Sequence, residues 1–592
     1  MEKINSIEMK IALAQQNYHI GNFENNTRKI IEAITKAKQM GAELVVFSEL
    51  CICGYPPRDF VEFNDFINKC NESIDLVKQH ADTIGVIIGA PQRNLSLGGK
   101  DLFNAGILLY ENEIKGVAHK SLLPTYDVFD EYRYFEPGVN FKTIEFKGFK
   151  IALTICEDLW NLADNPLYLS CPMDTLIQQG PDLMINISAS PFDYDHDEDR
   201  KEVIRANVLK YKLPMFYCNA VGSQTEIVFD GGSLVFNAYG QIVAEMKYFE
   251  EDFQVVEFSE SMLQREPEND TLIPPEQHFH SDSSQEPAAI ISDSRVSKLK
   301  DPNKIIEFLI DENNLRQIHL ALILGIRDYF SKMGFNKAIL GSSGGVDSAV
   351  TLVLACEALG AENVRAVLMP SQFSSDHSVS DAEQLSRNLG NPYDIIPIVN
   401  IYESFLTSLD PVFKDLPFGL AEENIQSRSR GNLLMAIANK FGYILLNTSN
   451  KSELATGYGT LYGDMAGGLS VLGDVYKMQV YALGKYLNRN QEIIPENILV
   501  KAPSAELRPD QKDSDSLPEY SLLDKVLYQY IEKRQGPKEI IAMGIDEALV
   551  NRVLKMVNTN EYKRNQFCPI IRVSSKAFGV GRRMPIVGKY LT

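Results

Sequence analysis

The stretch that decides the fold is KAILGSSGGVDSAVTLVLACEALG, residues 337–360. Its first five residues have the composition of a short buried strand, and the apolar run from Ala349 to Gly360 is that of a buried helix. Small residues, Ser342 to Gly345, join the two. A strand, a glycine-rich loop and a helix in this order are typical of a sheet with parallel strands. Such sheets bind ligands at the carboxyl ends of their strands, which is where this loop lies.

The loop has the features of a phosphate site. Consecutive small residues let backbone N–H groups converge on an anion, and the helix N-terminus behind them adds about half a positive charge. The hydroxyls of Ser342, Ser343 and Ser348 can donate further hydrogen bonds. A carboxylate at Asp347 would repel a bare phosphate, so its presence favours a bridging Mg²⁺. The Gly-Lys-Ser/Thr sequence of the Walker loop is absent, and a plain strand–helix turn is the alternative interpretation.

The flanking sequence continues the alternation of strands and helices. We expect a helix near 317–333, a strand at 364–370, a helix at 378–390 and a strand at 393–398. A further apolar helix from 431 to 442 runs into a buried strand, which ends in the polar segment NTSNKSE, residues 447–453. Buried polar groups at a strand end need partners. The pattern predicts a doubly wound parallel sheet with a polar site at its edge.

Longer motifs carry a resemblance to known families. SGGVDS resembles the pyrophosphate-binding loop of the ATP pyrophosphatase family, whose members split ATP between the α and β phosphates and transfer AMP to an acceptor. The segment 450–468, NKSELATGYGTLYGDMAGG, resembles the signature of NAD⁺ synthetases. Segments 503–520 and 561–570, PSAELRPDQKDSDSLPEY and EYKRNQFCPI, also resemble parts of that family. The resemblance implies a Rossmann-like C-terminal domain.

The same resemblance implies roles for individual residues. It places Mg²⁺ near Asp347 and Glu453. It implies that deamido-NAD⁺ contacts Asn424, Glu453 and Lys563. The residues implied for ATP are Gly341, Ser342, Ser343, Gly344, Gly345, Val346, Asp347, Ser348, Thr448, Lys477 and Ser504.

The N-terminal half reads as a mixed sheet in a layered α/β fold. One helix is expected within residues 25–41, with Asn26 or Thr27 as its cap and Gly41 at its end, and another from Glu198 to Lys212. The expected strands are 10–14, 44–48, 85–89, 106–110, 150–156, 182–188, 215–219 and 233–236.

Three residues of this half, Glu49, Lys120 and Cys156, each stand where a strand leaves the sheet. A cysteine thiolate can attack an amide carbonyl. A cation such as Lys120 lowers the pKa of a thiol and stabilises an oxyanion. Glu49 can accept the thiol proton, pass it to departing ammonia and then activate water. The backbone N–H of Glu157 is an expected second oxyanion donor. Taken singly, a buried inert Cys156 and solvated Glu49 and Lys120 are the plainer interpretations.

Together these segments resemble the Glu-Lys-Cys triad of the nitrilase superfamily, which implies a layered αββα domain. Glu131 matches a second glutamate of such sites and is expected to orient Lys120. The resemblance further implies that glutamine contacts Tyr126 and Ser190. A basic residue commonly follows this serine by six positions, and here that position is His196 in the acidic setting DYDHDED.

The segment between the halves, residues 259–301, is rich in Pro, Ser and acidic residues and reads as a linker. We therefore expect a glutaminase domain over 1–258 and a synthetase domain over 302–592. The net charge of −21 argues against tight nonspecific binding to nucleic acid or anionic membranes. The eight cysteines lack the spacing of a metal site, and no signal peptide or membrane-spanning run is evident. These features favour a cytoplasmic enzyme, and nitrilase-like domains imply a homo-oligomer by analogy.

The whole chain resembles the glutamine-dependent NAD⁺ synthetase family. This implies that L-glutamine is hydrolysed at Cys156 and that ATP and the released ammonia convert deamido-NAD⁺ into NAD⁺. One alternative is another amidotransferase with the same ATP loop, such as GMP or asparagine synthetase. The N-terminal cysteine of the asparagine enzyme and the Gly-x-Cys-x-Gly elbow of the GMP enzyme are missing. A second alternative is a nucleotide-sensing or scaffold protein with an inactive amidase half.

Overall fold

The computed structural model describes residues 8–162, 167–194, 196–263, 302–509 and 511–591. These residues form two compact units. The first is built on strands β1 to β14, and the second comprises the elements from α7 onward together with the short segments 192–195 and 225–228. Within the described part of the chain, no helix is both long and apolar enough to cross a membrane.

The first unit contains two six-stranded sheets. In the first sheet β1, β2 and β3 are parallel, and in the second β7, β8 and β9 are parallel, with antiparallel strands outside them. The first sheet has the order β14 (Asp252–Ser259), β1 (Glu8–Gln15), β2 (Leu44–Phe47), β3 (Gly85–Arg93), β4 (Leu102–Tyr110), β5 (Glu113–His119). The second has the order β13 (Ile242–Glu245), β12 (Leu234–Phe236), β9 (Met215–Asn219), β8 (Leu183–Ser188), β7 (Phe149–Ile155), β6 (Ile144–Phe146). A separate hairpin joins β10 (Val221–Gln224) and β11 (Ile227–Asp230).

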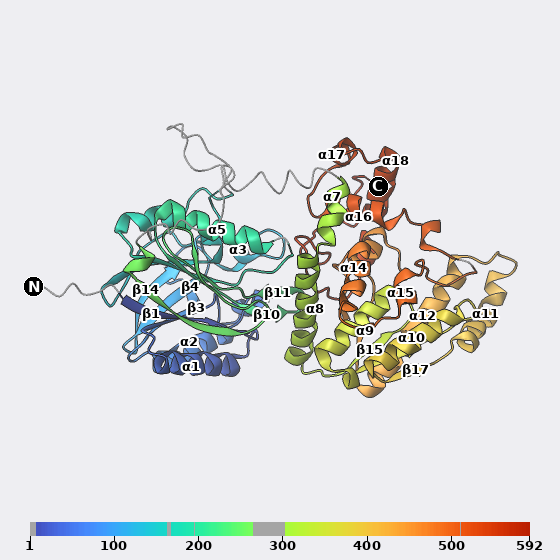
Figure 1. The fold of residues 1–592 in the computed structure, drawn as a ribbon, viewed down its shortest axis with the longest axis horizontal. Helices are drawn as coiled ribbons and strands as arrows, with labels where there is room; N and C mark the ends of the chain where they lie inside the picture. The colour runs from blue at the N-terminus through green and yellow to red at the C-terminus, as the bar shows by residue number, and fades with distance from the viewer. Residues whose placement is uncertain (1–7, 163–166, 195, 264–301, 510, 592) are drawn as a thin grey trace, which may run out of the picture. The chain divides into compact units, whose positions relative to one another are not determined.

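The core of this unit lies between the two sheets, where Leu13 and Val46 of the first pack in one cluster with Leu153 and Ile185 of the second. Helices cover the outer faces: α1 (Phe23–Gln39) and α2 (Asn64–Lys78) on one side, α4 (Pro172–Leu176) and α5 (His196–Tyr211) on the other. Figure 1 shows α1 and α2 on the side of the strands opposite to α5. The predicted αββα layering is therefore confirmed.

Local predictions in this unit were partly wrong. The cap of α1 is Asn22, whose side chain accepts from the N–H of Asn25 at 3.3 Å. Asn26 is instead buried within the helix, and its amide group binds the backbone of His19 and Ile52. Strands β5, β6, β10, β11, β13 and β14 were missed. One of them, β5, is charged and partly exposed, so it lacks the apolar run that marks a buried strand.

The second unit is organised around a five-stranded sheet in which every pairing is parallel. Its order is β17 (Tyr393–Ile395), β16 (Val364–Leu368), β15 (Ala338–Gly341), β18 (Ile444–Asn447), β19 (Leu469–Ser470). From β15 the chain adds β16 and β17 on one side and β18 and β19 on the other, which confirms a doubly wound sheet. The glycine-rich loop follows β15 and so lies at the switch point of the strand order, the usual ligand position.

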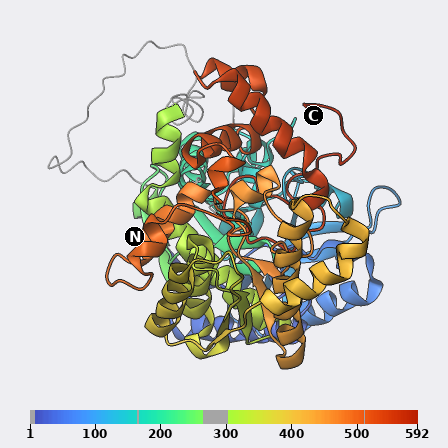
Figure 2. The ribbon, with the colours of Figure 1, turned by 90° about the vertical axis from the view of Figure 1, so that its right-hand side faces the viewer.

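Most of the second unit is helical. In Figures 1 and 2 the C-terminal helices α16 to α18, in red, gather at one end of this unit, away from β15, β17 and α10. The larger helices are α7 (Pro302–Leu309), α8 (Glu312–Met333), α9 (Val346–Leu359), α10 (Asp376–Leu389), α11 (Val399–Phe413), α12 (Leu420–Phe441), α14 (Lys477–Leu487), α16 (Tyr520–Ile531) and α18 (Glu547–Thr559). Shorter ones are α13 (Lys451–Thr456), α15 (Glu496–Val500), α17 (Pro537–Ala542) and α19 (Glu561–Arg564).

Four helices of this unit, α8, α9, α10 and α12, begin earlier than predicted. Helix α12 starts at Leu420 rather than 431, because its first half, AEENIQSRSR, is too polar to show an apolar stripe. Helix α9 starts at Val346 rather than 349. Asp347 and Ser348 therefore lie in the first turn of α9, with their backbone N–H groups among the unpaired donors of a helix start.

Candidate active sites

Glu49, Lys120 and Cys156 lie together at the ends of strands in the first unit. Glu49 comes two residues after β2, Lys120 directly follows β5, and Cys156 directly follows β7 at the start of a short 3₁₀ helix, Cys156–Leu159. The Nζ of Lys120 is 2.8 Å from Oε1 of Glu49, and neither side chain is exposed to solvent. Cys156 is 5% exposed, and its thiol interacts electrostatically with both charged groups.

Further hydrogen bonds hold this cluster in place. Oε1 of Glu49 accepts from the amide of Asn104 at 2.7 Å, and Oε2 accepts from the N–H of Ala189 at 3.0 Å. On its other side, the ammonium group of Lys120 donates to Oε1 of Glu131 at 2.7 Å. Burial raises the pKa of Glu131 to about 7, although the charge of Lys120 acts in the opposite direction. Glu131 thus lies where it can orient Lys120, as the sequence analysis expected.

The groups around Cys156 act on the pKa of its thiol in opposite directions. Burial raises the pKa of the Cys156 thiol well above its ordinary value and the charge of Glu49 raises it further, while Lys120 only partly opposes these effects. Lys120 thus lowers the pKa of the thiol, as expected, but burial disfavours the charged form more strongly than one paired ammonium favours it. The backbone of Cys156 has φ of 44°, in the left-handed region, a strained conformation of the kind that can be held at a functional site.

Tyr126, one of the residues expected to contact glutamine, binds the side chain of Glu157, for which the sequence predicted no role. The hydroxyl of Tyr126 donates to the two carboxylate oxygens of Glu157 at 2.9 and 3.0 Å, and that of Tyr168 donates at 3.1 Å. Burial raises the pKa of Glu157, although Lys120 opposes the change. The signal that could have identified Glu157 is an acidic residue next to the candidate nucleophile.

Ser190 is buried next to Ala189, and its N–H donates to Oδ1 of Asn219 at 2.9 Å. Because Ala189 binds Glu49, the segment after β8 connects Ser190 to the cluster of Glu49 and Lys120. His196 begins helix α5, but its side chain lies outside the described residues.

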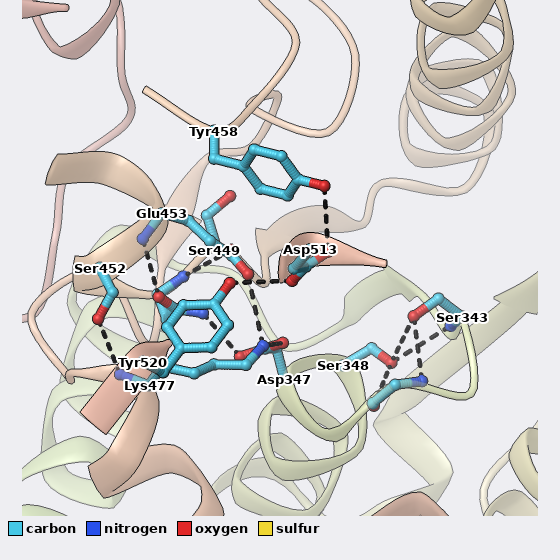
Figure 3. Close-up of polar contacts among 12 residues, drawn as sticks. Ser343, Asp347, Ser348, Ser449, Ser452, Glu453, Tyr458, Lys477, Asp513 and Tyr520 are labelled. Carbon is cyan, nitrogen blue, oxygen red and sulfur yellow. Dashed lines mark hydrogen bonds and ion pairs between the residues drawn. The ribbon is translucent and has the colours of Figure 1, made fainter. Parts of the chain in front are cut away.

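Two serines of the glycine-rich loop in the second unit interact with each other, as Figure 3 shows. The hydroxyls of Ser343 and Ser348 are 3.1 Å apart, and the N–H of Gly345 donates to the Ser343 hydroxyl at 3.3 Å. Gly344 has φ of 77°, and a Cβ there would lie 2.3 Å from the carbonyl oxygen of Ser378. Only glycine fits at this position without a shift of the backbone.

A cavity of about 290 Å³ opens in front of this loop. Thr448, Lys477, Ser504 and Glu453 line it together with the whole of residues 341–348. The structure therefore brings every residue that the resemblance implied for ATP to one cavity.

Lys477 lies between the two carboxylates that were expected to hold Mg²⁺ (Figure 3). Its ammonium group contacts Oδ2 of Asp347 and lies 3.5 Å from Oε1 of Glu453. Burial lowers the pKa of Lys477, but the two carboxylates outweigh this and raise it. Burial and the charge of Asp347 raise the pKa of Glu453 to about 8. Asn450 completes the cluster by donating to Oδ1 of Asp347 at 2.9 Å.

The remaining residues implied for deamido-NAD⁺, Asn424 and Lys563, meet at the turn that follows α13. The Nζ of Lys563 donates to the carbonyls of Gly457 and Gly459 at 2.7 and 2.8 Å, and Oδ1 of Asn424 accepts from the Thr460 hydroxyl at 2.8 Å. They border the helix that carries Glu453 but are not part of the cavity lining.

Sequence reasoning missed Asp513, a further carboxylate that lines the cavity. It accepts hydrogen bonds from the hydroxyls of Tyr458 at 3.0 Å and Tyr520 at 2.9 Å (Figure 3). Asp513 lies within segment 503–520, whose resemblance to the NAD⁺ synthetase family is the signal that could have identified it, because its acidic setting alone does not distinguish it from a solvated residue.

Comparisons with known proteins agree with the division of the chain into two halves. The sequence model of the carbon-nitrogen hydrolase family matches residues 10–266, and that of NAD synthase matches residues 318–567. A glutamine-dependent NAD(+) synthetase from Synechocystis is 42% identical over 97% of this chain and 98% of its own length. One from Thermotoga maritima is 40% identical over 98% of this chain and 99% of its own.

Among solved structures, a glutamine-dependent NAD+ synthetase from Acinetobacter baumannii, in complex with adenosine diphosphate, is 35% identical with a TM-score of 0.72. The match covers 98% of each chain. Fold and sites thus define a carbon–nitrogen hydrolase joined to an ATP-dependent ligase of the NAD synthase type. The chain belongs to the family of glutamine-dependent NAD(+) synthetases. The predicted family and enzyme class, a carbon–nitrogen ligase, are confirmed, and the GMP synthetase, asparagine synthetase and scaffold alternatives are not supported.

Proposed function

We propose that this enzyme hydrolyses L-glutamine to glutamate and ammonia at Cys156 and uses the ammonia, with ATP, to convert deamido-NAD⁺ into NAD⁺. The observation that carries the proposal is that one chain contains both a buried Glu49–Lys120–Cys156 cluster and a cavity in front of the SSGGVDS loop. We assign glutamine hydrolysis to residues 1–258 and NAD⁺ synthesis to 302–592, with 259–301 as the linker.

In the first reaction the neutral Cys156 thiol needs a base, and Glu49 is the carboxylate beside it. Glu49 takes the proton as sulfur attacks the amide carbon of glutamine. Lys120 and the backbone N–H of Glu157 stabilise the oxyanion of the tetrahedral intermediate. The proton then moves from Glu49 to the departing ammonia, which leaves a thioester. Glu49 next activates the water that hydrolyses this thioester to glutamate and restores the thiol.

Substrate recognition follows from the charges around Cys156. Glutamine carries an α-ammonium group, and Glu157 offers a buried carboxylate already held by Tyr126 and Tyr168. A buried carboxylate is stabilised by an opposite charge, so we assign the ammonium group of glutamine to Glu157 and Tyr126. Ser190 and His196 remain the proposed contacts for the rest of the glutamine molecule.

In the second reaction the pyridine carboxylate of deamido-NAD⁺ attacks the α-phosphate of ATP. The bond between the α and β phosphates breaks, giving an adenylate and pyrophosphate. The N–H groups of Gly344 and Gly345, the serine hydroxyls of the loop and Lys477 hold the phosphates. Ammonia then attacks the activated carboxyl carbon, AMP leaves, and NAD⁺ forms. Asn424, Glu453 and Lys563 are the proposed contacts for deamido-NAD⁺.

The donor set fits Mg²⁺, which prefers carboxylate, phosphate and water oxygens. Asp347 and Glu453 would hold the ion, and it would neutralise negative charge on the leaving pyrophosphate. Within the described ranges no group of three or more acidic, histidine or cysteine side chains is arranged to hold a metal.

All eight cysteines are unpaired, and we infer from this a reducing cytoplasmic location. We further propose a homo-oligomer, by analogy with nitrilase-like domains, which commonly self-associate.

The test is a product assay with glutamine, ATP and deamido-NAD⁺, each omitted in turn. We expect NAD⁺, AMP and pyrophosphate in equal amounts when all three are present. NAD⁺ formation without ATP, or ADP in place of AMP, would contradict the proposed reaction. Ammonium chloride in place of glutamine should also support synthesis.

A further inference from the structure

Lys501, the residue that follows α15, places its ammonium group beside the phosphate loop. Its Nζ donates to Oε1 of Glu506 at 2.7 Å and to Oγ of Ser375 at 3.3 Å, and it contacts Oγ of Ser378. Ser378 is also the residue against whose carbonyl Gly344 is packed, since a Cβ on Gly344 would lie 2.3 Å from that oxygen. Lys501 is therefore separated from the loop by a single residue.

The carboxylate of Glu506 is bound by donors of the kind that bind a phosphate group. Its Oε1 accepts from the hydroxyls of Ser378 at 2.7 Å and Ser375 at 3.1 Å, and its Oε2 lies 3.4 Å from the N–H of Ser375. Two hydroxyls and an ammonium group are donors that bind phosphate equally well. Glu506 also has φ of 49°, so its backbone holds the left-handed conformation while the carboxylate reaches these donors.

The charge of the cavity shows why a further cation matters. Of the described residues that line it, the basic ones are Arg430, Lys477 and Lys501, and the acidic ones are Asp347, Glu453, Asp464, Glu506 and Asp513. Lys477 is paired with Asp347 and Glu453, and the Nε of Arg430 donates to a backbone carbonyl. A triphosphate carries several negative charges, so each further cation that can pair with it favours binding, and Lys501 is the third basic residue of the described lining.

We propose that Lys501 is a phosphate-binding residue of the ATP cavity and that the carboxylate of Glu506 occupies its phosphate position until ATP enters. This inference rests on the proposed function, because it concerns the same ATP. When a phosphate replaces Glu506, the ion pair between Lys501 and Glu506 is exchanged for one between Lys501 and the phosphate. The side chain of Lys501 is 29% exposed, which leaves it room to turn toward the cavity.

The competing interpretation is a purely structural role, in which the ion pair of Lys501 and Glu506 only holds their loop against the start of α10. The two accounts predict opposite effects for the two partners. If Lys501 binds phosphate, Lys501→Met removes a ligand, whereas Glu506→Gln removes a competitor. If the pair has only a structural role, both substitutions break the same ion pair and should raise KM for ATP equally.

The experiment uses the full-length enzyme with ammonium chloride as nitrogen donor and saturating deamido-NAD⁺, so that glutamine hydrolysis is not involved. We expect Lys501→Met to raise KM for ATP about tenfold and to weaken inhibition by inorganic pyrophosphate by a similar factor, as loss of one charged hydrogen bond implies. Glu506→Gln should leave KM for ATP unchanged or lower it. Lys512→Met, an exposed lysine in the same connection, is the matched control and should behave as wild type.

Unchanged kinetics in Lys501→Met would overturn the proposal, and so would equal increases of KM in Lys501→Met and Glu506→Gln. Glutamine hydrolysis by each variant reports whether the chain is folded, and Lys501→Arg should recover part of the affinity for ATP. Calorimetric titration of inorganic pyrophosphate into wild type and Lys501→Met separates this inference from the proposed function. Weaker pyrophosphate binding in the variant supports Lys501 as a ligand even where wild type forms no NAD⁺.

Discussion

Lys120 and Glu49 form an ion pair of 2.8 Å in which neither side chain is accessible to solvent. A buried pair of this kind contributes little to stability relative to apolar residues of the same size, because both charges lose their hydration. Its presence at the end of two strands is therefore better explained by chemistry than by folding. Removing one partner leaves the other charge unpaired in the protein interior, which is the more damaging change.

Lys120→Met should therefore abolish glutamine hydrolysis and also lower the stability of the enzyme. The variant leaves Glu49 and Glu131 as neighbouring buried carboxylates with no cation between them. We expect a loss of at least ~10³ in kcat with glutamine and a loss of about 3–5 kcal/mol in the free energy of unfolding. Steady-state glutaminase assays and urea denaturation measure the two effects. Full stability together with full activity would show that Lys120 is dispensable.

Cys156→Ala should separate the two nitrogen sources. Without the thiol no thioester forms, so NAD⁺ synthesis from glutamine should fall to background, while synthesis from ammonium chloride stays within about twofold of wild type. Cys171→Ala, a half-buried thiol of the same unit, is the matched control and should retain both activities. If Cys156→Ala loses both activities, the division of labour between the two sites is wrong.

The raised pKa of Glu131 implies that the stability of the folded enzyme depends on pH. Because burial raises it from 4.5 to about 7 in the folded protein, the folded state binds more protons than the unfolded state between these values. This contribution to stability is present at low pH and is lost as the pH rises from 4.5 to 7. Glu131→Gln cannot ionise, so the difference in stability between wild type and variant should change across this window. Denaturation midpoints at pH 5 and pH 7.5 test this, and a difference independent of pH would contradict it.

The sequence allowed the fold to be predicted where a feature depends on neighbouring residues. The strand–loop–helix at 337–360 is local, and the apolar runs of β7, β8 and β9 show directly that these strands are buried on both faces. The polar first half of α12 and the exposed strand β5 carry no such pattern. These two segments take their structure from packing against the rest of the fold and not from their own sequence pattern.

In the candidate sites too, only features that depend on neighbouring residues could be predicted from the sequence. Glu49, Lys120 and Cys156 could be selected because each ends a strand, but the sign of the Cys156 pKa shift could not, since it depends on how completely the fold excludes water. The pairing of Glu157 with Tyr168 joins the nucleophile turn to a later loop. Such contacts depend on the course of the backbone and not on the spacing of residue types.

Gly344→Ala should disable ATP-dependent synthesis and leave glutamine hydrolysis intact. The added Cβ would lie 2.3 Å from the Ser378 carbonyl oxygen, and the positive φ of 77° is itself unfavourable for alanine. The loop must shift, and its N–H groups then no longer converge on phosphate. Gly334→Ala is the matched control, because Gly334 has a similar φ of 76° but open space around its Cβ position. It should cost about 1 kcal/mol of stability without loss of synthesis. Equal activities of the two variants would mean that the approach of Gly344 to Ser378 is not needed.

Glu157 is expected to act in glutamine binding rather than in bond breaking. Its carboxylate accepts hydrogen bonds from Tyr126 and Tyr168, so it is positioned before glutamine arrives and needs no reorganisation to meet an ammonium group. Glu157→Gln keeps the shape and the tyrosine contacts but removes the charge. KM for glutamine should rise by at least about tenfold with a smaller change in kcat, since the lost charge–charge contact is present in both ground and transition states. Tyr168→Phe, which removes one supporting hydrogen bond, should give a smaller rise. A fall in kcat at unchanged KM would instead assign Glu157 to proton transfer, because an interaction formed only in the transition state affects kcat alone.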